Sequence, residues 1–511
     1  MNNAQEARIP VIVGVGQIND RPKEDAAGLD TLALMKAALE SADRDAGGCF
    51  LAQLQSLDVV DQMSWPTMTW PSIEKIAPRL VEALGIAPTH LAMTPDPSGD
   101  GPVRLLNEAA NRIASGEAEV AAVVGGEALR TGAKRAAVEA QRGAATGQAP
   151  RQDLLREVAE QHFKPILRKY GLLAATDIYP LYENACRAAW GQKLAEAQLE
   201  SALIWSGMST IAADNPDAWI RTRYTPEQIL TPSADNRPVT FPYNKLMVAN
   251  NSVNQGAAVI VTSLARATAA GIAENRLVYV GAGAAAHEPD DFLKRDRYDY
   301  SAGMEVSLTE ALAANGLRTA DLDYVEFYSC FPCIPKMARR VLDWPLDRPH
   351  SVYGGLTFGG APIGNCMTHA AATLVNRLRT HGTHGLLYGN GGFVTHNHSL
   401  ILTRQRAMAA RPPRSYDYQR EADSRRGAIP RLIEDYSGAA TIETYVVPFD
   451  RNGEPRFGTI VARSVAGERF LCRVPREDKA GLAFLISGAN EPVGKQGAAV
   501  PGPDGFVYWM H

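Results

Sequence analysis

Short apolar runs that end in glycine alternate along the chain with segments whose apolar residues recur at helical spacing. Ile9–Gly16 is a β-branched run of the first kind, and Leu29–Ala42 follows it with the helical period. A helix is then predicted at Val103–Ser115 and a strand at Val120–Val124. Alternation of this kind indicates a layered α/β fold.

The order of the predicted elements is repeated in the second half of the chain. The first set continues through the apolar segments Leu203–Ala212, Asn254–Leu264 and Val278–Gly281. The second set consists of helices at Val306–Asn315 and Met367–Thr380 and strands at Tyr324–Tyr328, Gly385–Tyr388 and Leu400–Thr403. We therefore expect two halves of similar architecture.

The composition changes at two places, which predict the domain boundaries. A helical and loop-rich insertion spans about residues 130–242, and residues 404–431 are rich in Arg, Pro, Asp and Ser without an apolar period, which is typical of a linker. The predicted domains are an N-terminal half over 1–270 that includes the insertion, a C-terminal half over 271–405, a linker over 406–431 and a β-domain over 432–511.

The last domain is predicted from alternating strands. These are Ala440–Val447, Gly458–Ala462 and Arg469–Val474, and Asp450–Gly453 is a hairpin turn after the first of them. We expect a small β-barrel of the OB-like kind.

Composition and charge exclude several classes of protein. The 511 residues are 45% hydrophobic and 21% charged, which excludes disorder for the bulk of the chain. The net charge is −4 and the pI is about 6.2, so no global positive field attracts nucleic acid or anionic lipid. The arginines of residues 404–431 are interspersed with acidic residues and lack an aromatic platform. No nucleic-acid partner is expected.

The cysteines and the N-terminal residues predict the compartment. Six cysteines are scattered through the sequence, and the first residues have neither the basic nor the apolar region of a secretion signal. Apolar stretches such as Ala257–Ser263 fall short of the roughly 20 residues that a membrane-spanning helix needs. We expect a cytoplasmic protein without a membrane span.

Six short motifs in a fixed order carry a resemblance to the thiolase superfamily. In the N-terminal half they are Pro97-Ser-Gly-Asp100, Gly125-Gly-Glu127 and Asn250-Asn-Ser-Val-Asn-Gln-Gly-Ala-Ala258. In the C-terminal half they are Glu326-Phe-Tyr-Ser-Cys-Phe331, Gly354-Gly-Leu-Thr-Phe-Gly-Gly-Ala-Pro-Ile-Gly364 and Tyr388-Gly-Asn-Gly-Gly392. The resemblance covers roughly residues 8–403 and is greatest to the sterol-carrier-associated and thiolase-like branches.

The resemblance implies a fold and a ligand. It implies a five-layer αβαβα arrangement of two similar halves, a loop domain that covers coenzyme A, a homodimer, and an acyl-CoA thioester as substrate rather than a permanently bound cofactor. The insertion carries basic residues suited to the phosphates of such a carrier, namely Arg130, Lys134, Arg135, Arg142, Arg151 and Arg156.

The sequence departs from the thiolases at the residues that perform thiolysis. The nucleophilic cysteine of the family falls on Asp96, the activating histidine falls on Ala361, and the second cysteine falls on Tyr388. Neither Asp96 nor its neighbour Pro97 can form an acyl-thioester enzyme. Ordinary thiolysis through an acyl-cysteine is therefore not expected.

Tyrosines at motif positions favour aldol-type chemistry instead. Tyr328 and Tyr388 fall on positions that face the reaction centre in the family, and a tyrosine there can exchange a proton with a developing enolate or alkoxide or donate a hydrogen bond to it. Thiolase-like aldolases that act on CoA esters of steroid side chains resemble this arrangement, because they lack the usual cysteines and work with a separate OB-fold partner. By analogy, the C-terminal β-domain is that partner in the same chain.

The candidate residues follow from these motif positions. The catalytic candidates are Tyr328, Cys330, Tyr388, Asn390 and His396, and the candidates for binding substrate or CoA are Asp96, Ser98, Asn254, Gly355, Gly360 and Gly391. Asn390 is interpreted either as an oxyanion donor or as a turn residue with positive φ. His396 either contacts the substrate or is a hydrogen-bonded histidine of the core or loop.

Two other functions stay open. One is acetyl-CoA acetyltransferase (thiolase) activity in which Cys330 is the nucleophile. The other is a non-catalytic acyl-CoA or lipid carrier, or a scaffold whose β-domain recruits a partner enzyme. Cys330-Phe-Pro-Cys333 spells CxxC, but a second Cys/His pair at ligand spacing is missing, so no metal is expected.

Overall fold

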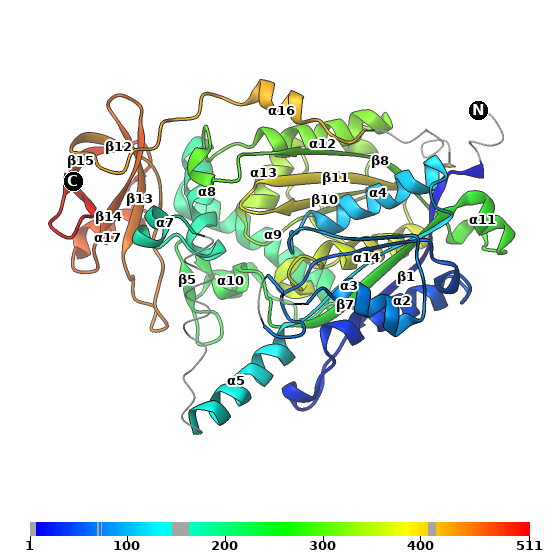
Figure 1. Cartoon of the computed structure of the whole chain (residues 1–511). Coiled ribbons are helices and arrows are strands. Elements are labelled where there is room, and N and C mark those ends of the chain that lie inside the picture. The colour runs from blue at the N-terminus through cyan, green and yellow to red at the C-terminus, as the bar shows by residue number, and fades with distance from the viewer. Residues whose placement is uncertain (1–6, 69–70, 73, 146–162, 407–414, 511) are drawn as a thin grey trace.

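The computed structural model describes residues 7–68, 71–72, 74–145, 163–406 and 415–510 (Figure 1). Two arginines of the predicted basic insertion, Arg151 and Arg156, and residues 407–414 of the predicted linker lie outside these ranges. Within the described ranges, no helix combines the length and the apolarity that crossing a membrane requires.

The described residues form a sheet of nine strands in the order β3-β2-β4-β7-β1-β8-β11-β10-β9. The strands of the N-terminal half are β1 (Pro10–Asn19), β2 (Ser56–Val59), β3 (His90–Met93), β4 (Val120–Ala128) and β7 (Asn254–Ser263). Those of the C-terminal half are β8 (Val278–His287), β9 (Tyr324–Phe327), β10 (His384–Gly391) and β11 (His396–Thr403). The halves meet where β1 pairs with β8, at Val11↔Tyr279 and Ile12↔Val278.

Helices cover both faces of each half, as the alternation of elements predicts. The helices of the N-terminal half are α2 (Thr31–Asp45), α3 (Ile76–Leu84), α4 (Gly101–Ser115) and α11 (Leu264–Ala269). Those of the C-terminal half are α12 (Ala302–Asn315), α13 (Cys333–Val341) and α14 (Cys366–Thr380). Helices α4 and α14 contact each other and strands of both halves, whereas α2 packs on the N-terminal strands and α12 on the C-terminal strands (Figure 1). The predicted five-layer αβαβα arrangement is thus confirmed.

The polypeptide between β4 and β7 forms the loop domain. Its helices are α5 (Leu129–Ala145), α7 (Pro165–Tyr170), α8 (Ala175–Ala189), α9 (Leu194–Asp214) and α10 (Pro226–Leu230), and its strands are β5 (Pro238–Thr240) and β6 (Tyr243–Asn244). Helix α8 packs against α13 of the C-terminal half. The loop domain is therefore attached to the half of the molecule that follows it in the chain.

A buried ion pair lies at this attachment. Lys336 of α13 pairs with Glu183 of α8, and the two side chains are 0% and 2% exposed. The Lys336 ammonium also donates to Ser201 Oγ, and the Tyr243 hydroxyl donates to the Glu183 carboxylate at 2.8 Å. Since each charge has several partners, the pair is satisfied despite its burial.

The C-terminal residues form the small β-barrel that the alternating strands predict. Its elements are β12 (Gly438–Val446), β13 (Gly458–Ser464), β14 (Arg469–Val474), α17 (Lys479–Ile486), β15 (Gln496–Pro501) and β16 (Val507–Met510). The barrel is closed in the order β12-β13-β14-β16-β15, with β14 parallel to β16. A short helix of the predicted linker, α16 (Gln419–Arg425), packs on α12 and β8 before the chain reaches the barrel.

We predict that Lys336→Met lowers the free energy of unfolding by about 3–5 kcal/mol, because it leaves the Glu183 carboxylate buried without a counter-charge. Urea denaturation monitored by circular dichroism measures the change. The control is Lys36→Met, which breaks an (i, i+4) pair with Glu40 whose side chains are 39% exposed and should cost about 0.5 kcal/mol or less. Equal losses in the two variants would contradict this account of the buried pair.

Candidate functional site

The N-termini of α4 and α14 meet at the centre of the molecule. A Cβ built on Gly364, which lies just before α14, would be 3.0 Å from the backbone of Pro97, which lies just before α4. Pro102 occupies the first turn of α4, where its missing amide hydrogen costs nothing. Because a helix N-terminus carries a partial positive charge, the two helices together favour negative charge between them.

Close backbone approach joins the start of α4 to the end of β10. A Cβ on Gly391 would collide with the Ser98 hydroxyl and the Asp100 carboxylate, and Ser98 donates a hydrogen bond to Asp100. A Cβ on Gly99 would collide with the Asn390 carbonyl and the Tyr328 ring. Glycine is thus required at both positions, and the structure brings Ser98, Gly391, Asn390 and Tyr328 together as the motif order predicts.

Tyr328 is the partly exposed tyrosine of this cluster. Its backbone N–H donates to the Tyr388 carbonyl at 3.0 Å, which extends the parallel pairing of β9 with β10 by one residue. Burial of the hydroxyl and the neighbouring thiols of Cys366 and Cys330 raise its pKa well above the ordinary value. The Tyr328 hydroxyl is therefore protonated at neutral pH and can donate a hydrogen bond.

Tyr388 and Asn390 are fully buried, and their side chains share one hydrogen-bond acceptor. The Tyr388 hydroxyl donates to Asn397 Oδ1 at 2.7 Å, and Asn390 Nδ2 donates to the same oxygen at 3.1 Å. Burial raises the pKa of Tyr388 well above its ordinary value. Asn390 does not have positive φ; Gly392 and Val394 adopt that conformation in the turn. Both side chains hold the end of β10 in place.

Cys330 lies 7% exposed beside a tyrosine of the loop domain. Burial raises the pKa of its thiol to about 12, although a hydrogen bond from Tyr179 opposes the increase. The Tyr179 hydroxyl oxygen also lies 3.0 Å from the Gly392 carbonyl oxygen, which competes for the same proton, and the Tyr179 ring stacks on Phe331 at 4.6 Å. A thiol in this environment is a poor nucleophile at neutral pH.

Asp96 and His396 are the titratable side chains at the accessible edge of the cluster. Burial raises the pKa of the half-buried Asp96 carboxyl, and the nearby His396 opposes that increase. His396 Nδ1 is 2.7 Å from His287 Nδ1, and burial followed by the charge of His396 lowers the pKa of His287. The short contact requires one of these two nitrogens to carry the shared proton.

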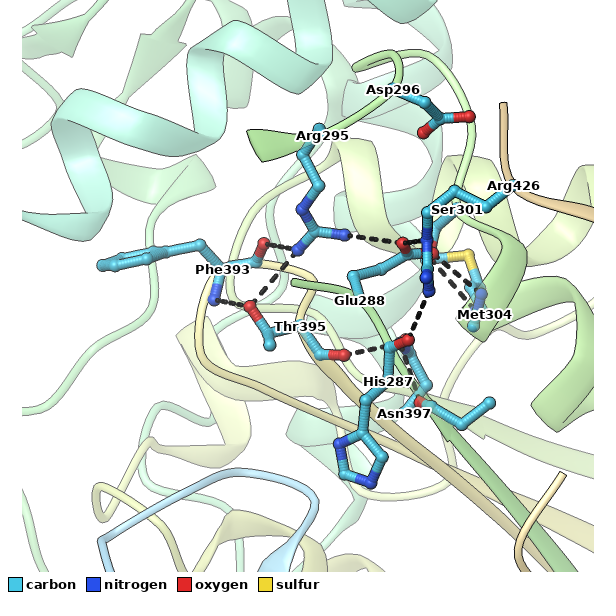
Figure 2. A network of polar contacts seen from close by, with 12 residues as sticks. His287, Glu288, Arg295, Asp296, Ser301, Met304, Phe393, Thr395, Asn397 and Arg426 are labelled. Carbon is cyan, nitrogen blue, oxygen red and sulfur yellow. Dashed lines mark hydrogen bonds and ion pairs between the residues drawn. The ribbon is translucent and has the colours of Figure 1, made fainter. Parts of the chain in front are cut away.

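A buried polar network supports the turn between β10 and β11. Figure 2 shows the Arg295 guanidinium directed at the Phe393 carbonyl, 2.7 Å away, and at the Thr395 hydroxyl. Glu288 lies between Arg295, at 3.5 Å, and Arg426 of the linker segment, at 3.0 Å. The position of Asn390 and His396 therefore depends on charges supplied by the loop that follows β8 and by the segment that leads to the barrel.

The remaining candidates lie outside the cluster. Gly355 and Gly360 both have positive φ; Gly355 is the first residue of the turn Gly355–Gly359, and Gly360 follows it. Asn254 is separate: its side chain accepts from the Thr131 N–H at 3.0 Å and donates to the Thr131 hydroxyl at 2.9 Å. Within the described residues, no contact joins the Asn254 side chain to Tyr328, Asn390 or His396, because the start of α5 satisfies it.

A groove of about 1080 Å³ lies between the body of the loop domain and the segment that leads into β7. Its inner wall is Val248–Ser252 together with Thr357, and its outer wall contains Arg237, Lys245 and Arg451. The inner wall is hydrogen-bonded to the cluster, since the Ala249 N–H donates to the Cys330 carbonyl at 3.1 Å and the Ala361 N–H to the Asn250 carbonyl at 2.9 Å. The groove therefore leads to the segments that carry the candidate residues.

Several residues of the site are absent from the sequence-based prediction. Tyr179 and His287 lie far from the motifs in sequence, and nothing in their local pattern identifies them. Asp100 and Cys366 lie within or beside motifs, so a search for titratable residues next to the motif glycines would find them. No three His, Cys, Asp or Glu side chains in the described ranges converge as a metal site requires.

Glu127, at the end of β4, is a buried carboxyl of the Gly125-Gly-Glu127 motif. Burial raises its pKa to about 8, although hydrogen bonds from the Ser64 hydroxyl and the Met63 N–H oppose the increase. The folded protein therefore holds Glu127 neutral at pH 7, which an unfolded chain would not do.

The fold and the cluster define a class of protein, a thiolase fold with an added C-terminal barrel. Human mitochondrial 3-ketoacyl-CoA thiolase in complex with CoA is similar in structure, with a TM-score of 0.57, 16% identity, and 77% of this chain and 98% of that chain covered. The Ltp2-ChsH2(DUF35) aldolase is similar at a TM-score of 0.57 and 18% identity, with coverage of 78% and 98%.

A narrower relationship follows from two further matches. Residues 421–501 match the family described as the thiolase-like protein type 1 additional C-terminal domain. The monomeric SCP2-thiolase like protein type 1 from Mycobacterium smegmatis is similar over the whole chain, with a TM-score of 0.79, 27% identity and 99% of both chains covered. No curated protein sequence matches the chain. The resemblance to the thiolase-like, sterol-carrier-associated branch is confirmed.

We predict that Cys330 resists alkylation in the folded protein. With a pKa of about 12, only about one thiol in 10⁴ is ionised at pH 8. Iodoacetamide labelling followed by peptide mass spectrometry should modify the exposed Cys49 well before Cys330, and denaturation in urea should remove the difference. Rapid labelling of Cys330 without unfolding would contradict the prediction.

The raised pKa of Glu127 predicts a pH dependence of stability. Between the unfolded pKa near 4.5 and the folded pKa near 8, folding binds a proton, so this contribution to stability is complete below pH 4.5 and is lost as the pH rises through 8. Glu127→Gln, which is neutral throughout, should show a shallower decline over this range in urea denaturation at successive pH values. An unchanged slope would show that Glu127 is ionised in the folded protein.

Proposed function

We propose that this chain is an acyl-CoA-binding enzyme of the thiolase-like type that makes or breaks a carbon–carbon bond beside the CoA thioester without an acyl-cysteine. One observation carries the proposal. By motif comparison the thiolase nucleophile falls on Asp96, and burial raises the pKa of the Cys330 thiol to about 12. Thiolate chemistry is therefore disfavoured, whereas the donors that stabilise an enolate are retained.

The chemistry needs stabilisation of negative charge on the thioester oxygen. The converging N-termini of α4 and α14 and the protonated Tyr328 hydroxyl supply it. In the cleavage direction a base removes the proton of a 3-hydroxyl group, the C2–C3 bond breaks, its electrons form the enolate, and a proton is returned to C2. His396 at the accessible edge, held by His287, is the proposed base, and Asp96 lies nearby.

The groove beside the segment that leads into β7 is the proposed site of CoA. Its inner wall is one hydrogen bond from the Cys330 and Ala361 segments, and three of its four charged lining residues are cationic. One solved structure of similar fold, that of human mitochondrial 3-ketoacyl-CoA thiolase, is a complex with CoA. CoA is here a part of the substrate and not a resident cofactor.

The proposal also assigns a role to the C-terminal barrel and considers the oligomeric state. One structural relative is an aldolase that contains a DUF35 component, and we propose that the barrel, as an OB-like domain, is the corresponding partner in the same chain. The homodimer and the cytoplasmic location remain predictions. The Mycobacterium smegmatis relative is described as monomeric, which favours a single chain as the working unit.

A non-catalytic acyl-CoA carrier is the second candidate function. Tyr388, Asn390 and Cys330 are almost fully buried, and hydrogen bonds within the protein occupy all three side chains. A carrier that binds acyl-CoA without a reaction does not need these side chains to reach the ligand, so their burial is compatible with that function.

The test is mass-spectrometric product analysis of the purified protein with 3-oxoacyl-CoA, 3-hydroxyacyl-CoA and branched side-chain CoA esters, with and without free CoA. We expect release of an aldehyde or ketone that does not require free CoA. Tyr328→Phe should lower the rate about 10²-fold or more, because an enolate-stabilising donor is lost, whereas Cys330→Ala should change it only a few-fold.

Two outcomes would contradict the proposal. Chain shortening that requires free CoA and is abolished by Cys330→Ala would establish a thiolase with Cys330 as nucleophile. Tight retention of CoA esters with no product at any enzyme concentration would establish the carrier.

A further inference from the structure

The hairpin between β12 and β13 extends beyond the barrel and lies along the loop domain (Figure 1). The Phe241 N–H donates to the Val447 carbonyl at 2.9 Å, and the Phe449 N–H donates to the Val239 carbonyl at 3.0 Å. An isolated bridge joins Thr240 to Pro448 between them. The hairpin thus adds a strand to β5, whose Val239 lines the groove.

Apolar packing fixes the same contact. Phe241 of the loop domain is 7% exposed and belongs to the hydrophobic cluster of the barrel, where its ring stacks on Tyr445 at 6.1 Å. The loop domain and the barrel therefore share side chains as well as backbone hydrogen bonds. The hairpin cannot move away from β5 without exposing Phe241.

The tip of the hairpin is a rigid turn. Asp450 accepts hydrogen bonds from the Asn452 and Glu454 N–H groups at 2.9 and 3.0 Å, and Gly453 has φ of +82°. Arg451, in the middle of this turn, has an exposed side chain that lines the groove. Its backbone is fixed before any ligand binds, which lowers the entropic cost of using it.

Three of the four charged residues that line the groove are cationic, and the fourth is Asp235. Arg237 and Lys245 line the same groove, and the Lys245 N–H donates to the Arg237 carbonyl at 3.0 Å. Among the residues that the structure describes, no carboxylate lies within ion-pair distance of Arg237, Lys245 or Arg451. Unpaired cations held together beside a groove favour a polyanionic ligand group.

We propose that the C-terminal barrel completes the CoA groove, with Arg451 of its β12–β13 hairpin contacting the phosphates at the nucleotide end of the ligand. The inference rests on the proposed function, because that proposal assigns the groove to CoA. Arg451 is then a binding residue that the barrel contributes to a site on the thiolase core. The barrel acts on substrate recognition while the reaction centre lies at the other end of the groove.

The experiment is isothermal titration calorimetry of the full chain with free CoA and with pantetheine, which lacks the nucleotide and its phosphates. Arg451→Ala should weaken CoA binding about tenfold, since charge-assisted hydrogen bonds to phosphate are lost, and should leave pantetheine binding unchanged. The matched control is Arg456→Ala, which removes the same charge from the same hairpin at a residue that does not line the groove.

The outcomes separate this inference from the function on which it rests. CoA affinity that is equal in Arg451→Ala and the unmodified chain would overturn the role of the barrel and leave CoA binding intact. Equal losses in Arg451→Ala and Arg456→Ala, or an equal loss for pantetheine, would also overturn it, because the effect would not pass through a phosphate contact. Absence of CoA binding by the unmodified chain would refute the proposed function itself.

Discussion

The packing of α4 and α14 between the two halves of the sheet is the constraint on which the rest of the structure depends. Both helices are buried at their N-terminal ends and along most of their length, so their N-termini cannot separate without opening the core. Gly99 and Gly391 let the backbones approach closely, and Tyr328, Ser98 and Asn390 therefore lie side by side. The packing of the layers therefore positions the residues of the candidate site.

The electrostatics of the site follow from this burial. Low polarity keeps the Tyr328 and Tyr388 hydroxyls and the Cys330 thiol neutral, because each has a raised pKa. Neutral donors beside two helix N-termini stabilise an anion that forms during a reaction, whereas they do not produce a nucleophile in advance. The same packing that excludes a reactive thiolate thus retains the features needed to stabilise an enolate.

Local patterns in the sequence were sufficient to predict most helices and strands and to identify the motif residues. The alternation of apolar runs predicts the two halves, and Tyr328 and Gly391 lie together because their motifs end neighbouring strands. Tyr179 and His287 reach the site through contacts between distant segments, which periodicity does not reveal. Asn254 has the sequence signature of a ligand contact, yet Thr131 satisfies its amide, and only the fold shows that competition.

The contacts between the loop domain and the barrel also constrain the order in which the parts of the protein can fold during synthesis. The Tyr170 hydroxyl accepts a hydrogen bond from the Val507 N–H, 337 residues later in the chain, and Phe241 packs in a core made of residues beyond 439. Such contacts cannot form until residue 507 has left the ribosome. The outer wall of the groove therefore reaches its native structure only after the barrel has been synthesised.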